Sequence, residues 1–471
     1  MTALAIFDLD RTLISGPSGP VFQRHLAEAG VSDAPTAGID ALYKIYEVMG
    51  ENPLTMQAAR YAVRGAKGWL VPAVRKASEA AAEELIERVL PYGRQLIAEH
   101  KEAGRLSVMA TTSPLCFVEP LANRLGMDHV FATEWATDGD VYTGHLEGRF
   151  LWGRNKMTAI KAWAKENGAD LGASYGYSDS VYDVPMLRTV GHPVAVNPDP
   201  QLETVARLNR WPIRYFDVPP GVVKVAGREL QDWLRPLNRP EMAGNARFDI
   251  QGTENIPSDG AAIVVFNHRS YFDSSAINFT LAKTNRPARF LGKKEVFDAP
   301  VIGALSAMMG GIRVDRGTGS DEPLKRAIQA LDAGEMVSMA PQGTIPRGPA
   351  FFEPELKGRW GAARLAHVTK APVIPIGVWG TEKVWPRSQR LPNILVSEPP
   401  MITVRVGTPV DLRYRSLDAD TKRIMSAIVD LLPPEARIAH TPTEEELVLT
   451  YPPGYTGDPN QESDRRPGTD T

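Results

Sequence analysis

The stretch "AAIVVFNHRSYFD" (residues 261–273) joins an apolar run to a histidine and an aspartate that follow it directly. His268 and Asp273 are five positions apart, which on one α-helix is a rotation of about 500° and places them on different faces. The two side chains can meet only if His268 lies on a turn after a strand and Asp273 opens a helix. An apolar β-branched run precedes the turn, and a helical pattern follows from about residue 274. The stretch therefore predicts a strand–turn–helix unit of an α/β fold.

This histidine and aspartate have the residue types of a general-base pair. A carboxylate that accepts from one ring nitrogen fixes the tautomer and leaves the other nitrogen free to take a proton. No serine nucleophile is needed if the substrate brings its own hydroxyl. The alternative is a structural role, in which the hydrogen bond only stabilises the start of the helix. A single His-x4-Asp spacing arises easily by chance in a chain with 8 His, so the neighbouring motifs decide.

Three further blocks follow in the second half of the chain: "GGIRVDRG" (310–317), "PQGTIPRG" (341–348) and "APVIPIG" (371–377). The first supplies cations, the second a glycine-containing loop whose N–H groups suit an anion, and the third an apolar wall suited to an acyl chain. The residues predicted to hold a phosphate or substrate here are Lys293, Arg313, Arg316, Gly343, Thr344 and Arg347.

In this order the blocks resemble the four motifs of the glycerophosphate and lysophosphatidate acyltransferase family, over about residues 245–415. The resemblance implies transfer of an acyl group from acyl-CoA or acyl carrier protein to the hydroxyl of a lysophospholipid, giving phosphatidate from 1-acyl-sn-glycerol-3-phosphate. It implies that His268 is the base and that Asp273 orients it. The chain departs from the family at Gln342, where the family has glutamate, and at Ile345, where it has arginine. The acceptor is therefore expected to differ, or Arg347 to replace the missing arginine.

The first part of the chain alternates strand and helix patterns. Strands are predicted at 4–10, 105–113, 174–180 and 193–199, with a helix at 155–168. Such alternation favours a Rossmann-like parallel sheet with helices on both faces. A helical insertion over about residues 20–90 is expected to form a cap above the carboxyl ends of the strands.

Carboxylates and a lysine cluster at these strand ends. "DLDRT" places Asp8 and Asp10 after the first strand, and "SDSVYD" places Asp179 and Asp183 after another. In open α/β sheets this edge binds ligands. Converging carboxylates repel one another unless a cation lies among them, and oxygen ligands suit Mg²⁺. The groups expected to meet a phosphate are Thr111 and Lys156.

These motifs resemble the haloacid dehalogenase superfamily of phosphatases, most of all its phosphoserine-phosphatase branch, over about residues 1–215. The resemblance implies that Asp8 attacks phosphorus and that Asp10 is the general acid and base. It implies a Mg²⁺ site made by Asp8, the Asp10 carbonyl and Asp179, with Asp183 in support. The phosphatase substrate is either related to the acyltransferase product or an unrelated small phosphomonoester such as phosphoserine. A third alternative is a silent module that regulates the acyltransferase.

Length and composition agree with a two-domain enzyme. The chain has 471 residues, a net charge of −3 and one cysteine, so neither nucleic-acid binding nor an intrachain disulfide is expected. No signal peptide and no spanning helix is expected, and basic residues beside an apolar stretch (296–311) favour a cytoplasmic protein attached peripherally to the inner face of the cell membrane. The expected organisation is a phosphatase domain (1–215), a linker (216–244), an α/β acyltransferase domain (245–440) and a disordered tail (441–471).

Overall fold

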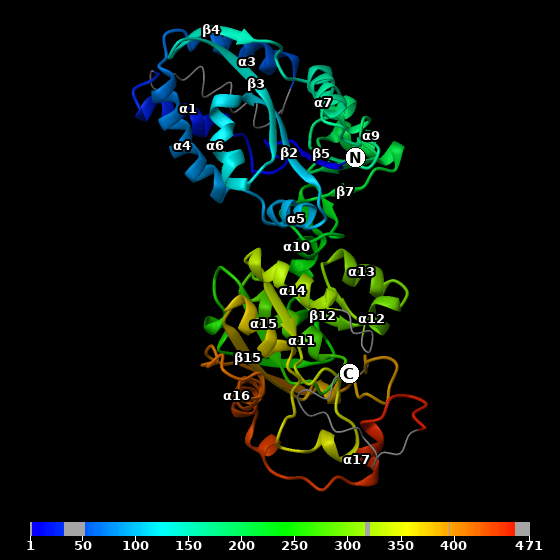
Figure 1. Ribbon diagram of the computed structural model, residues 1–471. Coiled ribbons are helices and arrows are strands. Elements are labelled where there is room, and N and C mark those ends of the chain that lie inside the picture. The colour runs from blue at the N-terminus through cyan, green and yellow to red at the C-terminus, as the bar shows by residue number, and fades with distance from the viewer. Residues whose placement is uncertain (1, 33–51, 316–320, 395, 457–471) are drawn as a thin grey trace. The chain divides into compact units, whose positions relative to one another are not determined.

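The computed structural model describes residues 2–32, 52–315, 321–394 and 396–456. The chain divides into two compact units, Met1–Pro220 and Gly221–Thr471. In the described residues each unit is built around a seven-stranded sheet with helices packed against it (Figure 1). This confirms the predicted α/β class with two domains.

The sheet of the first unit has the order β4-β3-β2-β1-β5-β6-β7. Its strands are β1 (Leu4–Phe7), β2 (Leu106–Pro114), β3 (His129–Asp138), β4 (Val141–Glu147), β5 (Tyr175–Ser178), β6 (His192–Val196) and β7 (Ile213–Arg214). All neighbours are parallel except β3 and β4. All four residues of β1 are buried, because helices cover both faces of the sheet. The central strands are therefore continuous apolar runs, as is typical of parallel sheets.

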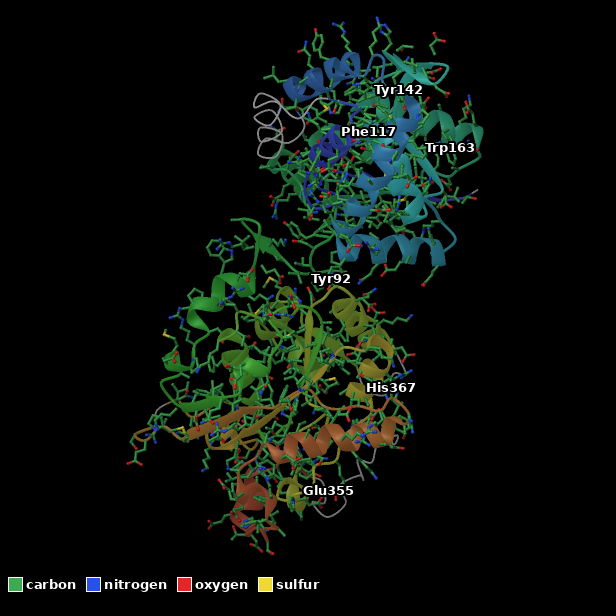
Figure 2. The ribbon with its side chains drawn as sticks, turned by 90° about the vertical axis from the view of Figure 1, so that its left-hand side faces the viewer. Tyr92, Phe117, Tyr142, Trp163, Glu355 and His367 are labelled. Atoms are coloured by element: carbon green, nitrogen blue, oxygen red, sulfur yellow. The ribbon has the colours of Figure 1, made fainter. Side chains whose placement is uncertain are left out.

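The helices of this sheet are α5 (Pro91–Glu102), α6 (Leu115–Leu125), α7 (Arg154–Glu166), α8 (Val184–Leu187) and α9 (Pro200–Asn209). The helices of the expected cap are α1 (Gly19–Glu28), α3 (Pro53–Gly65) and α4 (Val71–Glu87); residues 33–51 lie outside the described part of the chain. The β3–β4 hairpin, which the sequence analysis did not predict, is bonded to this cap. The Gly68 N–H donates to the Tyr142 carbonyl and the Val71 N–H to that of Asp140, at 2.9 and 2.8 Å. Figure 2 labels Tyr142 and also Phe117, which lies on α6.

The sheet of the second unit has the order β10-β16-β15-β11-β14-β12-β13. Its strands are β10 (Arg247–Gln251), β11 (Ala262–Phe266), β12 (Ala288–Lys293), β13 (Ile312–Val314), β14 (Met336–Met339), β15 (Val373–Trp379) and β16 (Met401–Val406). Only β15 and β16 are antiparallel neighbours among these pairs. Of these strands, β10 and β12 were not predicted.

The helices of the second unit are α10 (Leu230–Leu234), α11 (Asp273–Ala282), α12 (Lys294–Asp298), α13 (Ile302–Met308), α14 (Glu322–Asp332), α15 (Gly361–Thr369), α16 (Leu417–Asp430) and α17 (Glu444–Leu449). None of the helices in the described residues is both long and apolar enough to cross a bilayer. The apolar core packs on both faces of the sheet and includes most of β11.

The structure differs from the expected linker and tail. The part of the linker from Gly221 folds with the second unit, as a short hairpin of β8 (Lys224–Val225) and β9 (Arg228–Glu229) followed by α10. The buried Arg289 of β12 holds this segment through a bidentate ion pair with Glu229.

The tail from residue 441 is not disordered over its described residues, 441–456. It forms α17, and the buried Thr450 hydroxyl accepts a hydrogen bond from the Gly348 N–H at 2.8 Å. A capping box between Thr443 and Glu446 starts the helix despite its acidic composition.

Candidate active sites

In the first unit, two buried carboxylates lie at the ends of neighbouring strands. Asp8 directly follows β1 and Asp179 directly follows β5, and both are almost wholly buried. Because β1 and β5 are parallel, their carboxyl ends lie at the same edge of the sheet. The Asp8 N–H donates to the Tyr177 carbonyl at 2.9 Å, which extends the hydrogen-bond ladder of β1 and β5 to Asp8 itself. The sheet itself thus brings the two acidic motifs together.

A buried lysine lies among these carboxylates. Lys156 comes from the first turn of α7 and is 0% exposed. Its Nζ donates to Asp8 Oδ1 at 3.0 Å and to Asp183 Oδ2 at 2.8 Å. Ser178 Oγ also donates to Asp183 Oδ2, at 2.8 Å. A buried charge is tolerated only when it is paired, so this network favours an ionised Asp8 beside an ammonium group.

The carboxylate of Asp10 is held apart from that cluster. It accepts from the Ser18 N–H at 2.6 Å and from Ser113 Oγ at 3.4 Å. Burial raises the pKa of Asp10 above its ordinary value, and the hydrogen bonds from Ser18 offset this only in part. A raised pKa favours the protonated form that a general acid needs. Thr111 is buried near the end of β2, next to β1, with its hydroxyl accepting from the Ser113 N–H at 3.2 Å.

The oxygen atoms at this edge fit a hard divalent cation such as Mg²⁺. Asp183 Oδ1 is buried and has no hydrogen-bond partner in the described residues, so the cluster has acceptor capacity left over. No three His, Cys, Asp or Glu side chains in the described part of the chain gather closely enough to hold a metal alone. The ligand set that fits is therefore Asp8, Asp179 and the Asp10 carbonyl with water, because Mg²⁺ commonly binds one or two carboxylates and keeps several waters. The Asp10 side chain is bonded to Ser18 and Ser113, and Asp183 keeps Oδ1 available in support while its Oδ2 accepts from Lys156 and Ser178.

In the second unit, the His268–Asp273 pair has the predicted geometry. β11 ends at Phe266, and α11 begins at Asp273. His268 Nδ1 lies 2.7 Å from Asp273 Oδ2, and Asp273 is 0% exposed. The N–H groups of Arg269 and Ser270 donate to the same oxygen, at 2.7 and 2.8 Å. Thr381 Oγ donates to Asp273 Oδ1 at 2.5 Å. Four donors converge on this carboxylate, so it is an acceptor that keeps the His268 proton on Nδ1 and leaves Nε2 to act as a base.

The structure joins two of the residues predicted to hold a phosphate. Lys293 Nζ, at the end of β12, donates to Thr344 Oγ at 2.7 Å. The loop that follows β14 turns at Gly343, whose φ of 75° favours glycine. Lys293, Gly343 and Thr344 therefore belong to one region near the carboxyl ends of β12 and β14.

The predicted arginines lie differently. Arg313 is level with Gly292 in the β12–β13 register, one residue before the level of Lys293, so it leaves the sheet on the opposite face. Its guanidinium pairs with Asp298 and Asp315, at 2.7 and 2.8 Å. Arg313 is thus not brought to Lys293 in this structure, and its role in holding a phosphate stays a prediction. Arg316 lies outside the described residues.

The third arginine, Arg347, stacks on the Tyr455 ring with its guanidinium carbon 4.6 Å from the centroid. The C-terminal segment thus contacts the residue that was expected to replace the missing family arginine.

Several residues at the two sites make contacts that the sequence analysis did not predict. Arg11, inside the first motif, pairs with Asp179 at 2.9 Å. Thr381 and Gln342 contact Asp273 and His268 across 108 and 74 residues. The Asn267 side chain bonds both the N–H and the carbonyl of Val378, at 2.8 Å each. Arg11, Asn267 and Gln342 lie inside the predicted motifs, whereas Thr381 lies outside all of them.

Comparisons with known proteins agree with the two sites. Residues 5–188 match the haloacid dehalogenase-like hydrolase family, and residues 247–379 match the acyltransferase family. A protein described as inhibition of morphological differentiation protein, from Streptomyces azureus, is 35% identical over 219 residues, covering 46% of this chain and 79% of that protein. The histidinol-phosphatase of Neisseria meningitidis serogroup C (strain 8013) is 32% identical over 230 residues, covering 46% of this chain and all of the relative. The chain belongs to the haloacid dehalogenase-like hydrolases through its first unit, and its second unit carries an acyltransferase domain.

Among solved structures, the second unit is similar to the 1-acyl-sn-glycerophosphate (LPA) acyltransferase PlsC from Thermotoga maritima. The likeness has a TM-score of 0.33 at 22% identity and covers 42% of this chain and 76% of that one.

Proposed function

We propose that the second unit acylates 1-acyl-sn-glycerol-3-phosphate to phosphatidate, with acyl-CoA or acyl carrier protein as donor. The observation that carries the proposal is the His268–Asp273 pair, with Nδ1 bonded at 2.7 Å and the carboxylate fully hydrogen-bonded. Lys293 and the loop at Gly343 and Thr344 add a cation and N–H donors suited to the acceptor's phosphate.

In the proposed reaction, His268 first accepts a proton and then returns it. Its Nε2 takes the proton of the acceptor hydroxyl as the oxygen attacks the thioester carbonyl. The carbon–sulfur bond then breaks, and the imidazolium returns its proton to the leaving thiolate. Asp273 stays ionised throughout and stabilises the imidazolium.

Thiol release from acyl-CoA with lysophosphatidate tests this proposal. His268→Ala is expected to lower the rate by about 10²- to 10⁴-fold, which is the usual range for general-base catalysis. Full thiol release by this variant in the presence of acceptor would overturn the assignment. Parallel assays with acyl carrier protein identify the donor, and other lysophospholipids define the acceptor.

We propose that the first unit hydrolyses a phosphomonoester through an aspartyl-phosphate. Asp8 attacks phosphorus, and protonated Asp10 gives its proton to the leaving alcohol. Asp10 then takes a proton from the water that cleaves the aspartyl-phosphate. Lys156 holds Asp8 ionised, and with Thr111 it offers positive charge and a hydroxyl to the phosphoryl oxygens. When bound, Mg²⁺ supplies further positive charge opposite those oxygens.

Hydrolysis of a chromogenic phosphate, with and without Mg²⁺, tests the first unit. Asp8→Asn should abolish it and leave acyl transfer unchanged, and chelation should stop it reversibly. No hydrolysis by the wild type with any tested phosphate would favour a regulatory module instead. Labelled lysophosphatidate with acyl-CoA then separates the two substrate classes, since diacylglycerol appears only if the phosphatase acts on the lipid product.

We also propose peripheral contact of the second unit with a lipid surface. Val296, Val301 and Leu305 of the α12–α13 region are exposed, and they follow Lys293 and Lys294 in the chain. A groove of about 280 Å³ continues from Leu305 and Met309 to Leu234, Leu237 and Leu281. Exposed apolar side chains next to cations suit an anionic membrane interface.

Flotation with anionic vesicles tests the contact. The wild type should float, and a Val301→Asp, Leu305→Asp double variant should float less. A protein that stays at the bottom of the gradient would count against the proposal.

A further inference from the structure

Two side-chain amides bracket the backbone that carries His268. On the side of β15, Asn267 bonds both main-chain groups of Val378. On the side of β14, the Oε1 of Gln342 accepts from the His268 N–H at 2.6 Å. Both amides are nearly fully buried, Asn267 at 1% and Gln342 at 4% exposed. The strand has already ended here, so these bonds replace the ladder that would otherwise hold the chain.

The strand register explains why Gln342 reaches this position. β11 and β14 are parallel with Val265 level with Met339, and three residues further along the same register set His268 beside Gln342. An N–H group can only donate, so the Gln342 oxygen must face His268 and its NH₂ group must point away.

We infer that Gln342 is a positioning residue for the general base and that it holds His268 without adding charge. The inference rests on the proposed acyl transfer, and it concerns the position at which this chain departs from the family pattern. A glutamate at 342 can accept the same bond, so the amide is not needed for geometry. The amide and the carboxylate differ in charge, and a negative charge bonded to the His268 N–H would favour the imidazolium, which cannot take a proton.

The two parts of the inference need two variants. Gln342→Leu removes the acceptor and leaves a buried N–H unpaired, which loosens the turn. Gln342→Glu keeps an acceptor and adds a charge. The matched control is Gln251, on the exposed edge strand β10, where the same two substitutions are made. Three strand spacings separate β10 from β11 in the sheet order, which is about 14 Å.

The experiment measures kcat, KM and the pH profile of acyl transfer for all four variants. Gln342→Leu should lower kcat about 10- to 100-fold with little change in the acidic limb of the profile, as expected when a catalytic group is misplaced. Gln342→Glu should keep most of the maximal rate but move the acidic limb to higher pH. Both Gln251 variants should match the wild type.

An NMR titration of the His268 Cε1–H signal supplies a readout that does not need activity. The midpoint should rise in Gln342→Glu and stay in Gln251→Glu, and the His268 N–H should exchange faster in Gln342→Leu. An unchanged midpoint and unchanged exchange would overturn the inference even if the protein transfers acyl groups. If the wild type transfers no acyl groups but the two Gln342 variants show both NMR changes, the proposed function is overturned and the positioning role is kept.

Discussion

The second unit contains two histidine–aspartate pairs of almost the same geometry. His268 meets Asp273 at 2.7 Å and His367 meets Asp420 at 2.8 Å. The imidazole side chains are 20% and 21% exposed, and both carboxylate side chains are fully buried. Each carboxylate also accepts two backbone N–H groups, and for Asp420 these are Arg413 and Tyr414. The bond itself therefore does not distinguish a catalytic pair from a structural one.

The two pairs differ in their place in the fold. His268 follows the central strand β11, uses Nδ1 for the bond and lies beside the loop after β14. His367, which is labelled in Figure 2, lies on α15. Its Nε2 bonds Asp420 and so joins α15 to α16. Its remaining nitrogen, Nδ1, is the one nearer its own helix backbone. We therefore interpret His367–Asp420 as a structural tie, and it is an internal control for the dyad.

The largest expected contrast is between His268→Ala and His367→Ala. The first should lower acyl transfer by about 10²- to 10⁴-fold. The second should keep acyl transfer within a few-fold but lower the free energy of unfolding of the second unit by about 1–3 kcal/mol, since a buried carboxylate loses a partner. Parallel rate assays and urea unfolding measure both. Equal loss of activity in the two variants would end the distinction.

Replacing each aspartate by asparagine should separate the two pairs in the same sense, with activity lost at Asp273 and stability lost at Asp420. At Asp273, the ring of His268 and two backbone N–H groups share Oδ2, and among the donors in the described residues Thr381 alone faces Oδ1. An asparagine can turn its NH₂ group to Thr381, whose hydroxyl then accepts, so the fold should survive while acyl transfer falls about 100-fold from loss of the charge.

Asp420 offers no such escape, because Arg413 N–H faces Oδ1 while Tyr414 N–H and His367 face Oδ2. Asp420→Asn must therefore set a donor against a donor and should cost about 2–3 kcal/mol of stability. Thermal unfolding and rate assays on both variants decide this. A larger stability loss in Asp273→Asn than in Asp420→Asn would contradict the reading of the two networks.

The contact between His268 and Asp273 was predictable because it is local. Five positions of sequence, an apolar run before them and a helical pattern after them fix the strand–turn–helix unit. The acidic motifs at Asp8 and Asp179 follow predictable strands in the same way. Their meeting with Lys156 was expected from the family resemblance rather than from spacing.

The remainder depends on contacts that one sequence does not reveal. Gln342 reaches the pair through the strand register and Thr381 through a contact across 108 residues, and the motif around Arg313 does not show the face of the sheet on which that side chain lies. β12 was missed because its sequence, "ARFLGK", mixes apolar residues with Arg289 and Lys293. The buried arginine is satisfied by Glu229 and Glu335, a pairing far apart in the chain.

A smaller effect is expected in the pH dependence of stability. Burial tends to raise the pKa of Asp420, but hydrogen bonds from the Arg413 N–H, His367 and the Tyr414 N–H lower it below its ordinary value. A lowered folded-state pKa means that this carboxylate stabilises the fold above its unfolded pKa of about 3.9 and loses that contribution as pH falls through the folded value. The stability gap between wild type and Asp420→Asn should therefore shrink below about pH 4. Urea unfolding across this range measures it, and a constant gap would show that charge plays no part.

The smallest effect on activity is expected from Thr381, which donates to Oδ1 of Asp273 while His268 contacts Oδ2. Thr381→Val removes the donor to Asp273 Oδ1, while Thr381→Ser keeps it. The carboxylate retains its bonds to His268 and two N–H groups, so acyl transfer should fall only about three- to tenfold. In the Asp273→Asn background the same change should cost more, because the asparagine NH₂ group then has no acceptor. A double-mutant cycle on acyl transfer rates measures this coupling, and strict additivity would show that Thr381 does not face the carboxylate in solution.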